Sequence, residues 1–291
     1  MREIYILNPA AGQGGALNSS VPENVETYVT KSVGDCTDYV EKTCRENPET
    51  RFYVCGGDGT ISEAVTGIMR AGAGDTAEIS IVPTGTGNDF VRSFNGKKGK
   101  FRTDVIKCGD TYAVNMINTG FDCDVVTKAS EYKLLPLVSG SLAYYLGVAS
   151  VLTGKLGNDL EISYENENGE EIKASDKYLL ALVGNGGYYG GGFNANPCGE
   201  TDDGLLELLL VKKVSRPRFI ALVSDYKNGR HIFKNTDGKL TVIKKFQKFV
   251  SVERIKKVLI RGMKHFCADG EVDARETVAI EVIPKALNFV F

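Results

Sequence analysis

The chain has 291 residues, a length that corresponds on average to about two domains. Its 42% hydrophobic residues, 25% charged residues and net charge of −2 are typical of a soluble globular protein and argue against a low-complexity chain. Seven cysteines without a Cys-x-x-Cys pair make structural zinc an unattractive hypothesis and predict unpaired thiols in a reducing, cytoplasmic compartment.

The first 120 residues alternate short apolar runs with helical patterns. Strands are predicted over residues 4–7, 27–32, 52–55 and 79–82, and helices over 17–26, 36–45 and 60–70. This order predicts a parallel sheet with right-handed crossovers and a ligand crevice at the carboxyl ends of the strands. A Rossmann-like α/β domain is therefore expected over residues 1–122.

Beyond residue 110 the pattern changes, and it becomes mostly a period of two. Strands are predicted over residues 112–118, 160–164, 170–174, 179–183, 205–211, 240–243, 250–260 and 278–283, and helices over 125–134, 141–152 and 217–226. We expect a C-terminal antiparallel β-sandwich over residues 123–291, whose last strands are candidates for a return to the first domain. The longest apolar stretch, Leu142 to Leu152, is well short of the roughly 20 residues of a membrane-spanning helix, and the N-terminus does not resemble a signal peptide.

A glycine-rich junction follows the strand at 52–55. Gly56-Gly57-Asp58-Gly59-Thr60 precedes a helical pattern, which places Thr60 near the N-cap, where free N–H groups favour an anion. A carboxylate among phosphate-binding glycines indicates a divalent cation between Asp58 and the phosphates. Taken alone, the motif is equally compatible with a tight turn capped by an aspartate.

Two further loops of small residues follow other strands of this domain. They are Asn8 to Gly15 after the first strand and Pro83 to Asp89 after the fourth. Parallel strands bring all three loops to one edge of the sheet, which favours a polyphosphate site. The first loop is neither a Walker motif nor a dinucleotide fingerprint, because the closing Gly-Lys-Ser/Thr and the third glycine are absent.

Together with Gly120-Phe121-Asp122, Asp203-Gly204-Leu205 and Asp269-Gly270-Glu271, these loops occur in the order seen in the diacylglycerol kinase catalytic family. The chain resembles the bacterial lipid kinases of that family over nearly its whole length. The second glycine loop and the late Asp-Gly-Glu are the specific parts, because Gly-Gly-Asp-Gly-Thr also occurs in NAD kinases and resembles the phosphofructokinase site.

The resemblance implies a set of site residues. The ATP site would comprise Asn8, Pro9, Ala10, Ala11, Gly12, Thr30, Gly57, Asp58, Gly59, Thr60, Glu63 and Thr86. Catalytic Mg²⁺ would be held, directly or through water, by Asp58, Asp89 and Asp122, and a structural Mg²⁺ by Glu200, Asp203 and Leu205. Either Asp269 or Glu271 would be the base that takes the proton of the lipid hydroxyl. Ala10-Ala11 departs from the polar residues that family members often carry there, so main-chain contacts are the ones expected.

Three segments concern the acceptor and the membrane. The aromatic glycine loop from Asn185 to Phe193 is suited to line an acceptor cleft, and the apolar helix from Tyr144 to Leu152 is either core or the wall of an acyl-chain pocket. Residues 212–264 carry sixteen basic residues against three acidic ones, which fits an anionic membrane or a solvated strand face. The candidates for membrane contact are Lys244, Lys245, Lys248, Arg254, Lys256 and Lys257.

The sequence thus predicts an ATP-dependent, Mg²⁺-using lipid kinase, with diacylglycerol as the default acceptor. Its expected partners are ATP, a lipid and an anionic membrane surface, with no nucleic acid and with a homodimer left open. The alternatives are an NAD kinase, which shares the Asp58 loop, and a lipid or nucleotide sensor without turnover.

Overall fold

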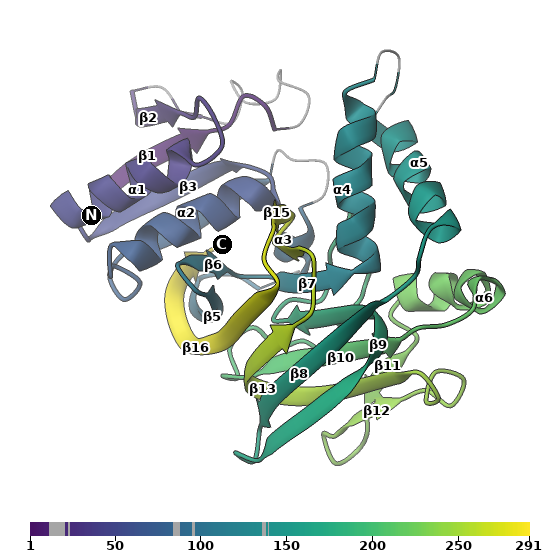
Figure 1. Cartoon of the computed structure of the whole chain (residues 1–291). Helices are drawn as coiled ribbons and strands as arrows, with labels where there is room; N and C mark the ends of the chain where they lie inside the picture. Colours follow the sequence, from purple (N-terminus) through teal and green to yellow (C-terminus); the bar gives the residue numbers. More distant parts are fainter. Residues whose placement is uncertain (12–20, 23, 84–87, 95–96, 136–137, 139) are drawn as a thin grey trace.

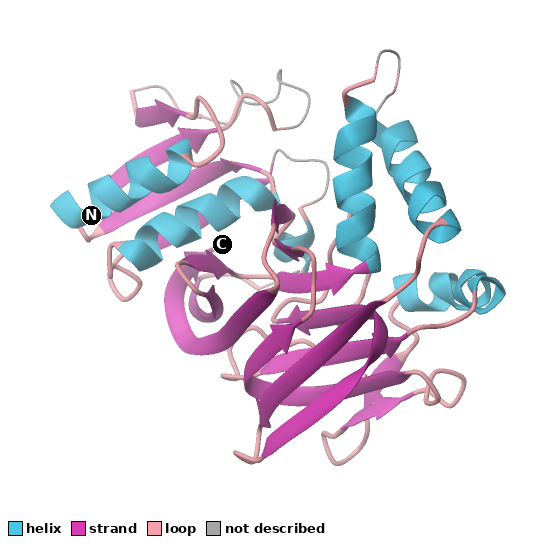
Figure 2. Ribbon diagram, viewed as in Figure 1, coloured by secondary structure: helices cyan, strands magenta, loops and turns pink. Residues whose placement is uncertain are grey.

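An α/β unit opens the chain and a unit rich in antiparallel strands follows it (Figure 1). The computed structural model describes residues 1–11, 21–22, 24–83, 88–94, 97–135, 138 and 140–291. Figure 2 shows two long helices lying along the first sheet, while strands dominate the second unit. None of the described helices combines the length and the apolarity needed to cross a bilayer.

Four parallel strands form the N-terminal sheet in the order β4-β3-β1-β2. They are β1 (Arg2–Leu7), β2 (Glu26–Val29), β3 (Thr50–Gly56) and β4 (Glu78–Pro83). The helices of this unit are α1 (Asp35–Glu46), α2 (Asp58–Arg70) and the short α3 (Asp89–Arg92). Apolar residues at helical spacing, such as Ile61, Val65 and Ile68 of α2, are fully buried in the core beneath the sheet.

The end of the chain returns to this N-terminal sheet. Strand β16 (Thr277–Val290) pairs in parallel with β4 and antiparallel with β5 (Lys100–Cys108). As a result, Leu287 and Phe289 lie fully buried in the N-terminal core. The two units therefore share one continuous sheet, and the exact domain boundary stays a prediction.

The C-terminal unit begins with two short strands, followed by a helical hairpin, and continues mainly as strands. Its elements are β6 (Thr111–Ala113), β7 (Met116–Gly120), α4 (Phe121–Lys133), α5 (Gly140–Thr153), β8 (Asn158–Asn166), β9 (Glu171–Gly184), β10 (Leu206–Lys212), α6 (Arg216–Lys227), β11 (Ile232–Lys234), β12 (Leu240–Val242), β13 (Val250–Arg261), β14 (Phe266–Ala268) and β15 (Glu271–Asp273).

Two long strands turn this unit into the predicted β-sandwich. The first half of β9 pairs with β8, and its second half pairs with β7 and β10. The first half of β13 pairs with β10, and its second half pairs with β8 and β16. Because β9 and β13 each belong to both layers, the sheet folds over a core that includes Leu160, Leu208 and Ile260.

Several element boundaries differ from those expected from the sequence. The predicted strand 112–118 is two strands, β6 and β7, and the predicted strands 170–174 and 179–183 are the single strand β9. Strands β5 and β11 were not expected. Half of the predicted helix 17–26 falls outside the described residues; its described residues are not helical, and Glu26 begins β2, so this prediction is wrong there. All seven cysteines are free and buried.

Candidate active site

The junction between β3 and α2 lies at the carboxyl edge of the parallel sheet. Helix α2 begins at Asp58 with Gly57 as its N-cap, so Thr60 lies in the first turn, three residues after the cap. A side chain at Gly56 would place its Cβ 2.5 Å from the Thr60 hydroxyl, so the close approach of main chain and helix requires glycine here. Asn8 Nδ2 donates to the Thr60 hydroxyl at 2.8 Å and joins the first loop to this junction.

Asp58 and Asp89 lie together behind this junction. Both Asp58 oxygens accept main-chain N–H groups, from Asp89 and from Phe90, each at 3.0 Å. Asp89 Oδ2 accepts the N–H of Gly191 at 2.7 Å, whereas its Oδ1 is buried without a hydrogen-bond donor. Burial raises the pKa of Asp89, and the neighbouring Asp58 adds to the effect.

Asp122 extends this group of acids from the first turn of α4. The hydroxyl of Tyr189, from the aromatic glycine loop, donates to Asp122 Oδ2. The Tyr226 hydroxyl of α6 lies 3.5 Å from that of Tyr189. Burial raises the pKa of Asp122 to about 6.

The Asp-Gly-Glu turn between β14 and β15 contributes two carboxylates in very different settings. Asp269 is buried and accepts three main-chain N–H groups, from Val114, Asn115 and Met116, at 2.8 to 3.1 Å. These bonds hold Asp269 at a φ of +46°, in the left-handed region. Burial raises the pKa of Asp269 to about 6 although its N–H donors favour the charged form. Glu271 is exposed, and its Oε1 lies 3.4 Å from where a Cβ on Gly59 would be.

Three cavities connect these groups in series. The loop cavity, of ≈ 380 Å³, lies over the N-terminus of α2 and the ends of β1 and β2. The acidic cavity, of ≈ 590 Å³, contains Asp58, Asp89, Asp122 and Asp269, which we call the cleft cluster. The apolar cavity, of ≈ 310 Å³, lies between α5, α6 and the sandwich.

Shared lining residues show that these cavities are neighbours. Gly57, Gly59 and Glu271 line both the loop cavity and the acidic cavity. Asp122, Tyr144 and Phe193 line both the acidic cavity and the apolar cavity. A ligand that spans the series therefore passes from a glycine-rich pocket, over a set of carboxylates, into an apolar pocket.

The structure brings most of the residues predicted from the sequence into this series. The loop cavity is lined by Asn8, Pro9, Ala10, Ala11, Thr30, Gly57, Gly59, Thr60 and Glu63. Gly12 and Thr86 lie outside the described residues. Tyr144, Tyr145, Val148 and Leu152 of α5 line the apolar cavity. Tyr145 and Leu146 are exposed rather than core.

The residues proposed for a structural cation lie outside the three cavities. Glu200 forms an ion pair with Lys234. Asp203 Oδ1 accepts the N–H of Leu205 at 3.0 Å, and its Oδ2 pairs with Arg254. The guanidinium of Arg254 also lies 3.7 Å from Glu167 and from Glu207. We call Asp203, Glu207 and Arg254 the Arg254 cluster. In this cluster, the guanidinium of Arg254 is the positive partner of Asp203.

Sequence reasoning missed the roles of Tyr189, Tyr226 and Glu207. Tyr189 belongs to the loop that the sequence marked only by its glycines and aromatic residues. Those features gave little indication that Tyr189 donates to Asp122. Glu207, on β10, is 1% exposed, and Asn196 Nδ2 donates to it at 2.8 Å. Asn196 Nδ2 also donates to the Gly186 carbonyl at 3.2 Å, so Glu207 holds the base of the same loop.

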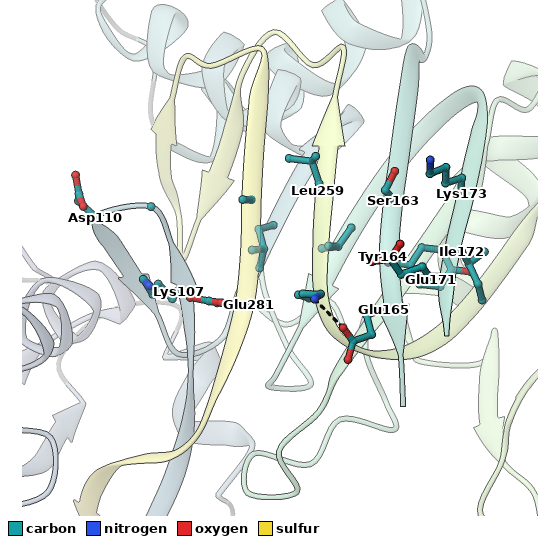
Figure 3. Close-up of a pocket in the computed structure, with 15 residues that line it drawn as sticks. Lys107, Asp110, Ser163, Tyr164, Glu165, Glu171, Ile172, Lys173, Leu259 and Glu281 are labelled. Carbon is teal, nitrogen blue, oxygen red and sulfur yellow. Dashed lines mark hydrogen bonds and ion pairs between the residues drawn. The ribbon is translucent and has the colours of Figure 1, made fainter. Parts of the chain in front are cut away.

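A further cavity, of ≈ 560 Å³, lies apart from this site on the face formed by β5, β8, β9, β13 and β16 (Figure 3). Two of its lysines are paired, Lys107 with Glu281 at 2.8 Å and Lys257 with Glu165 at 2.7 Å. It shares no lining residue with the series of three. Its lining mixes three lysines with four carboxylates and includes two ion pairs, so we assign it no chemistry.

The basic segment is also partly neutralised in the fold. Lys245 pairs with Asp225, Lys257 with Glu165 and Arg254 with Asp203. Only part of its positive charge is therefore available to an anionic partner, and membrane contact through it stays a prediction.

Comparison with known proteins agrees with this arrangement. Residues 4–119 match the model of the diacylglycerol kinase catalytic domain, and residues 115–291 match that of the YegS C-terminal NAD kinase beta sandwich-like domain. A "Probable lipid kinase YegS-like" of Enterobacter sp. is 28% identical over 98% of this chain and 94% of its own. The "Diacylglycerol kinase" of Bacillus subtilis is 28% identical over 71% of this chain and 69% of its own.

A solved structure shows the same fold. The crystal structure of a diacylglycerol kinase from Bacillus anthracis superposes with a TM-score of 0.65 at 21% identity, over 100% of this chain and 96% of the other. The matched domains together cover nearly the whole chain, in the order that the sequence predicts. The chain therefore belongs to the lipid kinase family that joins a diacylglycerol kinase catalytic domain to a YegS C-terminal domain.

Proposed function

We propose that this lipid kinase transfers the γ-phosphoryl group of ATP to the hydroxyl group of diacylglycerol and so forms phosphatidic acid. The observation that carries the proposal is the series of three cavities, because phosphoryl transfer to a lipid needs a phosphate pocket, an acidic centre and an apolar pocket in that order. A nicotinamide dinucleotide acceptor would have no use for an apolar cavity next to the acids.

ATP fits the loop cavity through main-chain contacts. The first N–H groups of α2 are free to bind phosphate oxygens, and Gly57 and Gly59 let a ligand approach them closely. Ala10 and Ala11 line the cavity without a polar side chain, as expected for a loop that contacts its ligand through the main chain.

Mg²⁺ fits between Asp58, Asp89 and the phosphates. Asp89 Oδ1 is a buried carboxylate oxygen without a donor, and the described residues contain no group of three acids, histidines or cysteines that would hold a metal unaided. Magnesium in kinases is commonly bound by one or two carboxylates together with substrate phosphates. The bound ion would neutralise phosphate charge, with Asp122 as a further ligand, directly or through water.

Glu271 is our candidate for the base, and Asp269 for the residue that positions it. Both oxygens of Asp269 are occupied by N–H donors, whereas Glu271 is exposed where the loop cavity meets the acidic cavity. The γ-phosphoryl group and the acceptor hydroxyl would meet at this boundary. A carboxylate so placed can accept the hydroxyl proton as the new P–O bond forms.

The two carboxylates can be separated by matched substitutions. We expect Glu271→Gln to lower kcat by about 10²-fold or more and to leave the melting temperature unchanged, because Glu271 is exposed. Asp269→Asn should also lower the free energy of unfolding, by about 1–3 kcal/mol, because an amide cannot accept all three N–H groups. Full activity of Glu271→Gln would refute its assignment as the base.

The acceptor is tested with labelled ATP and a panel of hydroxyl compounds comprising diacylglycerols of several chain lengths, sphingosine, monoacylglycerol and NAD. We expect transfer of the labelled phosphoryl group to diacylglycerol to exceed transfer to sphingosine, monoacylglycerol and NAD. In the cell, this transfer would take place at the cytoplasmic surface of a membrane. Labelled NADP, or no labelled lipid at all, would overturn the proposal.

A further inference from the structure

Six of the eleven strongly exposed large apolar side chains among the described residues lie on the α4–α5 hairpin and on α6. They are Leu134 (86% exposed), Leu135 (51%), Leu142 (46%), Tyr145 (70%), Leu146 (37%) and Ile220 (65%), which we call the α5 face. Leu142, Tyr145 and Leu146 share one side of α5 because they are three and four positions apart. Exposed apolar side chains gathered on one side of a helix, as these three are, are typical of an interaction site.

Helix α5 is unusual for a helix that faces water. Its residues, Gly140–Thr153, include no Asp, Glu, Lys or Arg. Its other side packs closely on α4, since a Cβ at Gly147 would lie 2.8 Å from the Val125 carbonyl oxygen. A surface helix normally carries charged residues opposite its buried side, so the absence of any charge here points to a second apolar environment.

The apolar cavity reaches the surface at two residues of the α5 face. Tyr145 and Ile220 are exposed and also line this cavity, whose far end reaches Asp122. Figure 1 shows α4 and α5 side by side, with α6 next to the end of α5. Arg216 fixes that neighbourhood, because its guanidinium donates to the carbonyls of Leu152 and Gly154 at the C-terminus of α5.

The charges beside the α5 face suit an anionic surface. Helix α6 has no acid in its first turn, where Arg216 and Arg218 are exposed. The acids near the outside of α4 and α6 are paired, Glu131 with Lys128 and Asp225 with Lys245. Anionic lipid headgroups would thus meet arginines rather than free carboxylates.

We propose that the α5 face docks into a lipid bilayer and admits the acyl chains of the acceptor to the apolar cavity. A second copy of the chain on this face would close the opening of the cavity, whereas a bilayer supplies the acceptor through it. At about 1.5 Å per residue, α5 is too short to span a membrane, so it would lie in the interfacial region. The inference rests on the proposed function, because it assigns the apolar cavity to a lipid.

The test uses the full chain with Leu134→Ser, Leu142→Ser and Leu146→Ser combined, since none of these leucines lines a cavity of the site. The matched control combines Val29→Ser and Phe233→Ser, two other exposed apolar residues. Flotation is measured with vesicles of phosphatidylcholine, phosphatidylglycerol and dioleoylglycerol. Turnover is measured both on these vesicles and on monomeric dioctanoylglycerol.

We expect the triple variant to lose vesicle binding and turnover on vesicles by about tenfold or more, and to retain parental turnover on dioctanoylglycerol. The control should behave like the parent in every assay. Parental flotation of the triple variant, or a parent that does not float, would overturn the docking surface. A dimer of the parent that the triple variant abolishes, without any change in flotation, would instead identify a contact between copies.

Failure of the proposed function gives a different result. If the parent transfers phosphate neither to dioleoylglycerol nor to dioctanoylglycerol, diacylglycerol is not the acceptor of this kinase. Flotation would still report whether the α5 face binds a bilayer.

Discussion

The cleft cluster and the Arg254 cluster contain similar carboxylates, but different groups balance their charge. In the cleft cluster, Asp58 and Asp269 accept five main-chain N–H groups between them, and Asp122 accepts a tyrosine hydroxyl. In the Arg254 cluster, a guanidinium pairs with Asp203 and lies 3.7 Å from Glu207. The first is held largely by dipoles, and the second contains its own cation.

This difference predicts which cluster would gain more from a cation supplied by the solution. Main-chain dipoles fix carboxylates in place but do not cancel their net charge, so a divalent ion can still bind to them. A guanidinium supplies a full positive charge, and its partners gain little from a metal. The nearest cation to Asp89, Arg92, lies at 3.8 Å and is half-exposed, which makes its compensation weak.

Asp89→Asn should have the largest effect, because it removes charge from the cleft cluster at the buried oxygen without a donor. We expect kcat/KM for ATP to fall on the order of 10³-fold. We also expect the rise in melting temperature that Mg²⁺ produces in the parent to disappear. The matched control is Asp202→Asn, the same change at an exposed acid beside the Arg254 cluster. An unchanged response of Asp89→Asn to Mg²⁺ would contradict the comparison.

Arg254→Met tests the other cluster and should act on stability rather than on metal binding. Removing the guanidinium takes the ion-pair partner from Asp203, and Arg254 itself is only 19% exposed. We expect the free energy of unfolding in urea to fall by about 3 kcal/mol while the Mg²⁺ response persists. Recovery of the lost stability on adding Mg²⁺ would show that this cluster, too, accepts a metal.

The sequence predicted which loops and carboxylates form the site better than it predicted the groups that pair with those carboxylates. Glycines and carboxylates just after predicted strands located the loop cavity, because parallel strands end at one edge whatever the details of packing. It could not reveal that Arg254, counted in a basic segment, faces Asp203, because the pairing joins β13 to the loop before β10. Nor could it show that Asp269 accepts N–H groups from residues 114–116.

The predicted strand boundaries were wrong where tertiary structure overrides the local sequence pattern. The polar run Ser175-Asp176-Lys177 interrupts the apolar alternation, yet β9 continues through it as the strand passes from one layer to the other. Strand β5 was missed because four of its nine residues are charged and its apolar residues do not alternate regularly, while its pairing with β16 supplies the stabilisation.

Glu207→Gln concerns the buried acid of the Arg254 cluster. Burial raises the pKa of Glu207 to about 8, from an ordinary value of 4.5, so the folded chain holds this proton more tightly than the unfolded chain. Its contribution to stability is complete below pH 4.5 and is lost as the pH rises through 8. We expect the parent to lose about 2 kcal/mol between pH 6 and pH 8, and the variant to lose less. Equal losses in urea titrations at both pH values would mean that Arg254 keeps Glu207 ionised.

Tyr189→Phe should have the smallest effect, because it removes one hydroxyl and leaves every carboxylate of the cleft cluster in place. Its hydroxyl donates to Asp122, which lies where the acidic and apolar cavities meet. We expect kcat/KM for diacylglycerol to fall about tenfold, with little change in the KM for ATP, because the loop cavity is at the other end of the series. Tyr226→Phe is the matched control, since its hydroxyl lies 3.5 Å from that of Tyr189 and, among the described residues, bonds to no carboxylate. An equal loss in both variants would show that the pair acts by packing in the apolar cavity, and a loss confined to Tyr189→Phe would show that even a cluster held by dipoles depends on each donor.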